Sequence, residues 1–364
     1  MLACFDIGTI VLSRLADPAI SRHITAMLRF LYFIIFCGLT ACNINPTGIQ
    51  MQAGWQARSL AAWHDHHPDM MVFSKDGKWL YISCETQASL LSPSLIAINL
   101  ENNQQHTLLF GLARADALKM SPDGSLWLGE EVPDGLIWRI TEPSKLPDEQ
   151  RVDRMQLQSS HPAITPLLHA GRFSHEGLTF SQDGRFAYMA DEWKEGCIYR
   201  YDMRTRKLYV LHKKKGWIAI REPNNARIDA EKLHGQYFDR IEDMETLPDG
   251  RVLLAETGTG KILVLDDHGD KPSIQTWLEH DQLIHPDNLA WDEQRGWLWI
   301  TDDDKPSYLW AWDGKELREI ARHDDAEITG VTIRGDDVYI NLQRSLSRPE
   351  ILLHLHEQAN IPES

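Results

Sequence analysis

The feature that most constrains this chain is a short turn sequence that recurs along it. An Asp-Gly turn stands between two runs rich in Leu, Ile, Val and aromatic residues, which is the pattern of a β-hairpin. Looser versions of the turn occur twice more towards the C-terminus. The turns are SKDG (74–77), SPDG (121–124), SQDG (181–184), LPDG (247–250), DEQRG (292–296) and RGDD (334–337). Six hairpins in one chain predict a repetitive all-β architecture.

Each hairpin is followed by a polar loop and another strand-like run, and several units continue into a fourth run such as KLYVLH (207–212). The units lie roughly 40 to 65 residues apart, a spacing typical of propeller blades. No long amphipathic helical period appears between them. We therefore predict an all-β fold, a single six-bladed β-propeller, with an ordinary β-sandwich of six hairpins as the alternative.

The N-terminal region has the pattern of a targeting signal. Residues 28–41 form an apolar run behind Arg29 that is too short to span a bilayer and has the length of a signal peptide. The run leads into LTAC (39–42), which resembles a bacterial lipobox with Cys42 as the lipidated residue. We expect translation to start at Met27. The alternative is a buried N-terminal helix.

These features predict the boundaries of the domains. The expected segments are a signal region over 1–42, of which 1–26 is not translated, a linker over 43–62, the propeller over 63–358 and a tail over 359–364. Lipid on Cys42 would anchor the protein to a membrane without spanning it. Asn43 after the cysteine favours the outer membrane of a bacterial envelope, on its periplasmic side.

Charge limits the partners. The formal net charge is −16, and nucleic acid is excluded because neutralising phosphates requires a basic face. We expect a monomer that contacts the membrane only through its lipid anchor.

After processing, Cys84 and Cys197 would be the remaining thiols, and an envelope location permits a disulfide between them. We expect both to be small buried residues.

Acidic residues flank the predicted hairpins in register. In each unit a polar residue precedes the first strand and another follows the second, and antiparallel pairing brings both to the same end of the blade. The pairs are Asp69 and Glu85, Asp116 and Glu130, Glu176 and Asp191, Glu242 and Glu256, Asp287 and Asp302, and Glu327 and Gln343. In a propeller they would form a ring of twelve polar residues, eleven of them acids, around one mouth of the central channel.

Such a ring predicts a cation site. Crowded carboxylates repel one another and raise one another's pKa values, so a bound cation would relieve a large cost. Calcium takes six to eight oxygen ligands, which the ring can supply. The alternative is that Asp and Glu flank strands merely as solvated loop residues.

Several stretches resemble the PhoX-type alkaline phosphatase family of β-propellers. They are GRFSHEGLTF (171–180), AYMADEWKEGCIYRYD (187–202), RIEDMETLPDGRVLLAE (240–256), HPDNLAWDEQRGWLWITDD (285–303) and EITGVTIRGDDVYINLQR (327–344). The resemblance implies a calcium-dependent phosphatase whose centre also holds two iron ions bridged by acids and a cysteine. It implies catalytic roles for Glu176, Glu242 and Glu130, with Glu131 beside the last. Gly129 stands where the family has the iron-binding cysteine, and Cys84 lies at the equivalent place one blade earlier.

The ring and the resemblance together give one set of metal ligands and three hypotheses. The predicted ligands are Glu130, Glu131, Glu176, Asp191, Glu242, Glu256, Asp287, Asp302 and Glu327. The first hypothesis is metal-assisted hydrolysis of a phosphorylated small molecule, with calcium as the cofactor and iron dependent on a replacement for the missing cysteine. The alternatives are a calcium-dependent lactonase or esterase, and a calcium-stabilised propeller that binds a ligand without catalysis.

Overall fold

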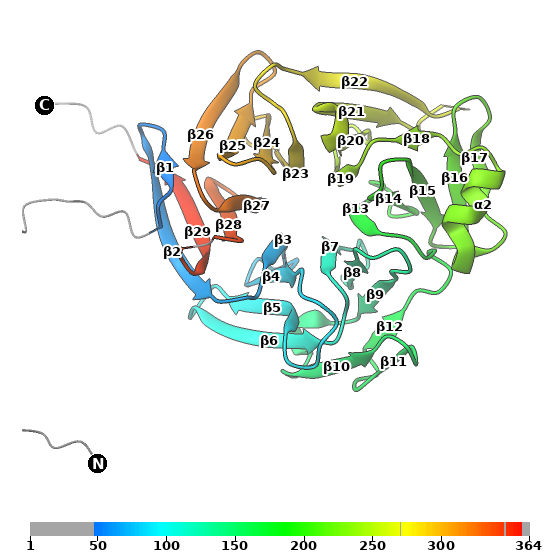
Figure 1. Ribbon diagram of the computed structural model, residues 1–364, viewed down its shortest axis with the longest axis horizontal. Coiled ribbons are helices and arrows are strands. Elements are labelled where there is room, and N and C mark those ends of the chain that lie inside the picture. Colours follow the sequence, from blue (N-terminus) through cyan, green and yellow to red (C-terminus); the bar gives the residue numbers. More distant parts are fainter. Residues whose placement is uncertain (1–46, 270, 346, 359–364) are drawn as a thin grey trace, which may run out of the picture. The chain divides into compact units, whose positions relative to one another are not determined.

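The computed structural model describes residues 47–269, 271–345 and 347–358, and in them six sheets stand around a common centre (Figure 1). Each sheet is one blade of a six-bladed β-propeller, so the predicted fold class is confirmed. The predicted signal region with Cys42 and the predicted tail lie outside the described residues.

The first two strands of each blade form the predicted hairpins. The innermost strands are β3 (Pro68–Phe73), β7 (Ala115–Met120), β13 (His175–Phe180), β19 (Ile241–Thr246), β23 (Pro286–Asp292) and β27 (Glu327–Arg334). The second strands are β4 (Trp79–Cys84), β8 (Leu126–Glu130), β14 (Phe186–Asp191), β20 (Val252–Glu256), β24 (Trp297–Asp302) and β28 (Asp337–Gln343).

Two further strands complete each blade towards the outside. The third strands are β5 (Pro93–Asn99), β9 (Ile137–Ile140), β15 (Gly196–Asp202), β21 (Lys261–Asp266), β25 (Ser307–Trp312) and β29 (Glu350–Glu357). The fourth strands are β6 (Gln104–Phe110), β12 (Ile164–Pro166), β16 (Lys207–His212), β22 (Ser273–Glu279), β26 (Leu317–His323) and β2 (Trp55–Trp63).

Short elements extend the blades at their edges. The additional strands are β1 (Gln50–Met51) on β26, β10 (Gln150–Asp153) on β6, β11 (Gln158–Ser159) on β10, β17 (Gly216–Ala219) on β16 and β18 (Tyr237–Phe238) on β15. The helical elements are η1 (Pro143–Lys145), η2 (Pro223–Asn225), α2 (Ala226–Lys232) and η3 (Thr257–Thr259). No helix in the described part of the chain has the length and apolar character needed to cross a membrane.

The N-terminal strand closes the ring. β2 pairs along its length with β29, so blade six combines the start of the propeller with its end, and β27 of this blade contacts β3 of blade one. β1 and β2 therefore belong to the propeller, and the linker predicted over 43–62 is corrected accordingly. The stretch WQARSLAAW (55–63) can pair because its buried ends, Trp55 and Trp63, pack into the cores on either side of β29.

The recurring turns form as predicted at the end of each blade opposite the predicted acid ring. In blade one, Asp76 accepts hydrogen bonds from the Ser74 hydroxyl (2.6 Å) and the Lys78 N–H (3.2 Å). Asp183 does the same in blade three. The turn glycines need φ values above zero, as at Gly124 (86°), which explains why glycine recurs there.

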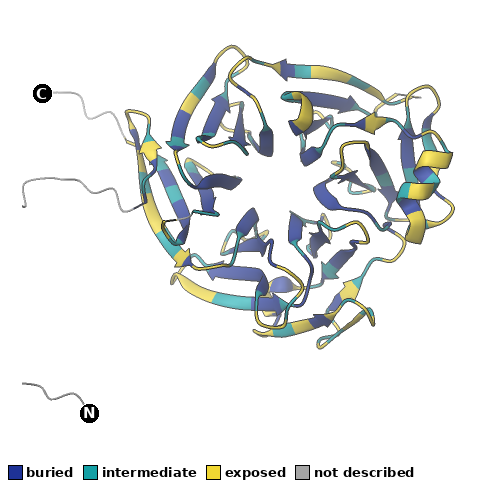
Figure 2. Cartoon of the chain, in the orientation of Figure 1, coloured by how far each residue is buried: buried dark blue, intermediate teal, exposed yellow. Residues whose placement is uncertain are grey.

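The core lies between neighbouring blades. Trp127 of β8 packs edge-on against Phe180 of β13, with ring centroids 5.1 Å apart, and so joins blade two to blade three. Trp299 is buried with side chains of blade six. Figure 2 shows that the inner strands are buried and that exposed positions concentrate on the outer strands and loops.

Cys84 and Cys197 are both buried as predicted, and among the described residues no disulfide joins them.

Candidate metal centre

Each of five inner strands carries its acid at an interruption in the strand pairing. In blade three, His175 pairs with Asp191 and pairing resumes only at Leu178, so Glu176 and Gly177 have no cross-strand partner. A β-bulge of this kind re-aims the side chain at the interruption. Equivalent interruptions hold Asp69, Asp116, Glu242 and Asp287 in blades one, two, four and five.

Blade six departs from this pattern. The pairing of β27 with β28 is interrupted between Thr329 and Thr332, whereas Glu327 lies before the interruption and pairs with Gln343. Glu327 is still mostly buried and accepts a hydrogen bond from Arg344 (3.2 Å). The sixth acid therefore comes from a different position in its strand.

At the ends of the second strands, most of the predicted residues stand one position before the residue whose side chain joins the inner-strand acids. Side chains alternate between the two faces of a strand, so a shift by one residue changes the direction of the side chain. The groups that join the inner-strand acids are Glu85, Glu131 and Glu192, the first residues after β4, β8 and β14. Glu85 and Glu131 were predicted, whereas Glu192 was missed.

The residues that end these strands are held by protein groups instead. Glu130, a predicted catalytic residue, is fully buried and accepts hydrogen bonds from the Ala113 N–H (3.0 Å) and from Arg154 (2.9 Å). Asp191 forms an ion pair with Arg227 (2.5 Å). Two further predicted ligands are bound in the same way, Glu256 by the Asp239 N–H and the Thr259 hydroxyl, and Asp302 by the Asp304 N–H.

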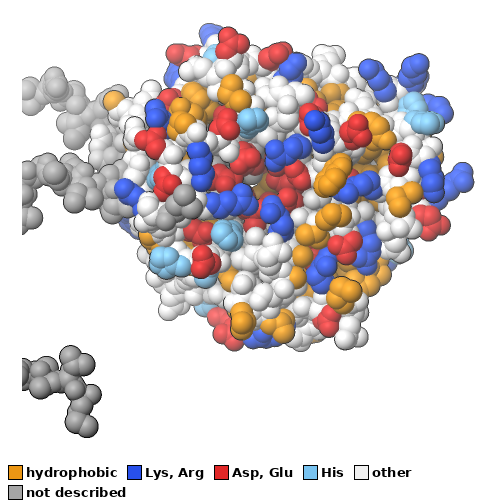
Figure 3. All heavy atoms as spheres, in the orientation of Figure 1, with side chains coloured by type: hydrophobic (Ala, Val, Ile, Leu, Met, Phe, Trp, Pro, Cys, Tyr) orange, Lys and Arg blue, Asp and Glu red, His pale blue; other side chains and the backbone are white. Residues whose placement is uncertain are grey.

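Seven acids converge in a row across the mouth, whereas the predicted ligands Asp287 and Glu327 belong to none of its groups. Three groups have ligand oxygens within 4.8 Å of one another, and the groups share Asp116 and Glu176, which makes the row continuous from blade one to blade four. We call this set the acid row. Its members are Asp69, Glu85, Asp116, Glu131, Glu176, Glu192 and Glu242. Figure 3 shows acidic side chains in a central hollow, with basic side chains around it.

Four members of the acid row have buried oxygens without a hydrogen-bond partner; Oε1 of Glu242 is in an ion pair with Arg240, and the other three oxygens have neither kind of partner. These three atoms are Oδ1 of Asp69, Oδ1 of Asp116 and Oε2 of Glu176. The side chains are nearly inaccessible; Asp116, for example, is 2% exposed. An unpartnered buried carboxylate oxygen costs about 1–3 kcal/mol or more, so such atoms indicate that a partner is absent.

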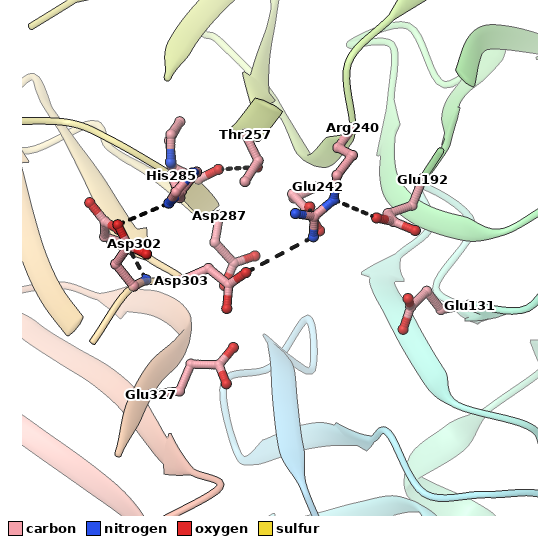
Figure 4. A network of polar contacts seen from close by, with 12 residues as sticks. Glu131, Glu192, Arg240, Glu242, Thr257, His285, Asp287, Asp302, Asp303 and Glu327 are labelled. Carbon is pink, nitrogen blue, oxygen red and sulfur yellow. Dashed lines mark hydrogen bonds and ion pairs between the residues drawn. The ribbon is translucent and has the colours of Figure 1, made fainter. Parts of the chain in front are cut away.

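Three arginines brace the row. Arg114 binds Glu85 (2.6 Å) and Glu131 (2.6 Å), and Arg344 also binds Glu85. Arg240 binds Glu192 (2.8 Å) and Glu242 (2.5 Å) and lies 3.9 Å from Asp303. Figure 4 shows Arg240 between Glu192 and Asp303, with Asp287 and Glu327 nearby.

The three arginines were not predicted, although a local signal exists. Arg114 and Arg240 each stand two residues before an inner-strand acid, Asp116 and Glu242 respectively. All three arginines adopt positive φ angles (45°, 57° and 52°), which are unusual for residues other than glycine. Strained backbone of this kind is retained where the surroundings require the side chain in one direction.

Burial sets the electrostatics of the row. Loss of solvent, and then the neighbouring acids, raise the pKa values of Asp69, Asp116 and Glu176 well above their ordinary range. Burial and Glu85 raise the pKa of Glu131 to about 9 despite its contact with Arg114. Burial likewise raises the pKa of Glu327 to about 8. Three arginines are therefore too few to compensate the acids, and without further cations some of the carboxyls hold protons at neutral pH.

The donor set fits a hard divalent cation. It consists of carboxylate oxygens from several blades, and among the described residues no cysteine or histidine belongs to the acid row. Oxygen-only sites of this kind suit calcium or magnesium rather than softer metals. A fourth group, formed by His285, Asp302 and Asp304, lies apart from the row.

A cavity opens beside the acid row. It has a volume of about 340 Å³ and reaches Glu85 at one end of the row. It is lined by Asp65, His67, Glu85, Thr86, Gln87, Ser92, Arg114 and Arg344. The cavity is thus large enough for a small organic molecule, and each of the residues that line it has a polar or charged side chain.

The structure does not provide the cysteine of an iron centre. Gly129 is in contact with blade three, and a Cβ atom added there would lie 2.7 Å from the Cβ of His175 and 2.8 Å from the Cβ of Ala117. Cys84 is buried among apolar side chains such as Ile82 and Ile96, and burial raises the pKa of its thiol. No cysteine of the described chain therefore takes the place of the family's iron ligand.

Comparison with known proteins supports the fold. No protein-family model and no curated protein matches the sequence. Solved structures that resemble the chain include a putative gluconolactonase, with a TM-score of 0.56 and 13% identity over 87% of this chain and 97% of that chain. A gluconolactonase from Xanthomonas campestris gives a TM-score of 0.52 and 12% identity over 87% of this chain and 93% of that chain.

A luciferin-regenerating enzyme is similar to the same degree, with a TM-score of 0.56 and 10% identity over 84% of this chain and 98% of that chain. At these identities the likeness shows the propeller architecture. The expected propeller is therefore confirmed, whereas the finer resemblance to phosphatases gains no support from these structures.

Proposed function

We propose that the protein is a divalent-cation-dependent hydrolase that opens a lactone or ester at the mouth of its propeller. The observation that carries this proposal is the acid row with its three unpartnered buried oxygens, on Asp69, Asp116 and Glu176. The row spans four blades, and the fold needs no such concentration of buried acids, because the opposite end of the same strands is closed by ordinary turns.

The cation would be held by the unpartnered oxygens, with calcium as the first candidate. Asp116 and Glu176 would supply ligands in the middle group of the row, and Asp69 and Glu242 would supply ligands in the groups on either side of it. When bound, such a cation acts as a Lewis acid on a carbonyl oxygen.

The chain's own residues supply the other parts of the site. Glu131 lies beside Asp116 and Glu176 and is held by Arg114, so it is positioned to take the proton of an attacking water. Arg114 also faces the cavity next to Glu85, where it can orient polar groups of a substrate. These roles require only side chains that already meet at the mouth.

Charge and packing favour a lactone or ester over a phosphomonoester. A neutral lactone or ester enters an acid-lined mouth without repulsion. A phosphate dianion would be repelled by the acids and would need more positive charge than the three arginines provide. Gly129 leaves no space for the cysteine on which the phosphatase chemistry depends. Two of the similar solved propellers are described as gluconolactonases, which agrees with this choice.

The test is a substrate panel with the purified protein and excess calcium. We expect hydrolysis of an aldonolactone or an aryl ester and little hydrolysis of an aryl phosphate. Glu176→Gln should abolish turnover because it removes charge from the row at constant size. Asp183→Asn, in the turn at the other end of blade three, is the matched control and should retain activity.

The other outcomes distinguish the alternatives. Turnover of the aryl phosphate alone would show that the protein is a phosphatase and would contradict this proposal. Calcium binding without turnover of lactones, esters or phosphates would indicate a ligand-binding propeller without catalysis.

A further inference from the structure

Large apolar side chains are exposed almost exclusively at the mouth end of the propeller. Among the described residues eight large hydrophobic side chains are classed as exposed, and seven of them belong to loops and edges at this end. We call these seven the apolar rim. They are Leu90, Leu91, Met155, Trp193, Ile228, Tyr237 and Ile284. Leu91 is 90% exposed and Met155 is 82% exposed.

The apolar rim comes from blade one, blade three and the connection between blades four and five. Leu90 and Leu91 lie between β4 and β5, and Met155 lies in the turn between β10 and β11. Trp193 directly follows Glu192 of the acid row, and Ile284 stands just before His285 and β23. Ile228 and Tyr237 belong to α2 and to β18, which pairs with the start of β15. The rim therefore lies on more than one side of the opening.

The opposite end of the propeller has no such side chains among its described residues. Its turns expose Lys75, Asp76, Asp183 and Glu293, and each turn is polar. The exposed apolar groups are thus distributed asymmetrically between the two ends. This asymmetry makes the mouth end the better candidate for an interaction surface.

Basic side chains are interspersed with the rim. Arg151, itself exposed, donates a hydrogen bond to the carbonyl of Leu90 (2.9 Å), and Lys194 is exposed next to Trp193. Exposed Leu, Met and aromatic side chains beside Arg and Lys are typical of surfaces that lie on lipid headgroups.

The path of the chain gives an independent reason to place a membrane at this end. In β1, Gln50 pairs with Arg322, and β26 ends one residue later at His323, at the mouth end of blade five. The chain therefore enters the propeller at the mouth end. Six residues separate Cys42 from Ile49 in the sequence, and seven Cα–Cα steps of at most ~3.6 Å span no more than ~25 Å, so the predicted lipid on Cys42 would be tethered close to that entry point.

We propose that the mouth end of the propeller docks on the surface of a lipid bilayer, with the apolar rim inserted among the headgroups. The occupant of the rim is thus a membrane rather than a soluble partner. The proposal does not depend on the reaction catalysed. It extends the predicted contact with the membrane from the lipid anchor alone to the face that carries the acid row.

The test uses the full-length chain reconstituted into vesicles of phosphatidylethanolamine and phosphatidylglycerol. A polarity-sensitive fluorophore is attached to a cysteine introduced by Leu91→Cys or Met155→Cys. Glu293→Cys, in the exposed turn between β23 and β24, is the matched control at the opposite end. The native Cys84 and Cys197 are buried, and the unsubstituted chain serves as the labelling control.

We expect the probes at positions 91 and 155 to become several-fold brighter on vesicles and to be quenched by nitroxide lipids, while the probe at 293 stays in water. Equal exposure of the probes at both ends would overturn the proposal, and so would insertion of the probe at 293. Circular dichroism of each labelled variant confirms that it is folded.

Discussion

The two ends of the same hairpins carry acids with opposite electrostatics. At the turn end, hydrogen bonds from serine hydroxyls and backbone N–H groups lower the pKa values of Asp76 and Asp183. At the mouth end, burial raises the pKa values of Asp116 and Glu176. The turn acids are exposed and have local donors, whereas the mouth acids are buried among other acids. The comparison separates acids that stabilise turns from acids whose burial and grouping would suit the binding of a cation.

The arginines differ in the same way. At the turn end, Arg251 binds Asp249 two residues away, within a single turn. At the mouth end, Arg114 joins Glu85 of blade one to Glu131 of blade two, and thus ties two blades together. Contacts between blades are what concentrate charge at the mouth.

The largest expected difference between the two ends is in activity. Asp116→Asn removes an unpartnered ligand oxygen and should lower kcat/KM for the lactone or ester at least about 100-fold, since even indirect changes around a metal cost 10–100-fold. Asp183→Asn should change it less than about twofold, because surface substitutions have small effects. Steady-state kinetics in excess calcium measures both, and similar losses at the two ends would contradict the distinction.

The next effect is the stability of the metal-free protein as a function of pH. Glu131 has its pKa raised from 4.5 to about 9, and Glu327 from 4.5 to about 8. The folded state therefore keeps protons that the unfolded state has released, so the free energy of unfolding should fall as the pH rises from about 5 to 9. Turn acids with lowered pKa values act in the opposite sense, and their contribution is lost only at acidic pH.

Calcium should reverse this loss. A cation at a hundredfold excess over its Kd stabilises the folded state by about 2.7 kcal/mol. Urea denaturation across the pH range, with chelator and with calcium, checks both statements. A metal-free protein whose stability is constant or rises between pH 5 and 9 would show that the acid row is solvated.

A smaller effect is expected from the bracing arginines. Arg114→Met leaves Glu85 paired with Arg344 only and removes the guanidinium that binds Glu131. In the absence of calcium it should lower the free energy of unfolding by about 2 kcal/mol. Arg251→Met removes an exposed local pair and should cost about 0.5 kcal/mol or less. Thermal melts of both variants measure the two losses of stability. Calcium should restore more of the stability of Arg114→Met than of Arg251→Met.

Local pattern predicted the blades and the inner-strand acids. The Asp-Gly turns placed the hairpins, and Glu176 and Glu242 stand at the starts of the strands in which they were expected. The second-strand residues were harder to assign because the direction of a side chain changes with each residue at a strand end. Asp191 was therefore predicted where Glu192 faces the mouth.

The other differences come from contacts between distant segments. β2 pairs with β29 nearly 300 residues away, and local periodicity gives no indication of that partner. Arg344 of blade six meets Glu85 of blade one only after the ring has closed. Sequence pattern describes each blade, and the geometry of the closed ring decides which charges meet.

The central claim is that the acid row binds a cation in exchange for protons, and calorimetry tests it most directly. Calcium is titrated into the metal-free protein at pH 7.5 in two buffers with different ionisation enthalpies. We predict saturable binding with release of about one proton or more per ion, because ligands must lose their protons to bind a metal. Asp116→Asn should abolish this signal and Asp183→Asn should retain it. The absence of saturable binding, or equal apparent enthalpies in the two buffers, would contradict the claim.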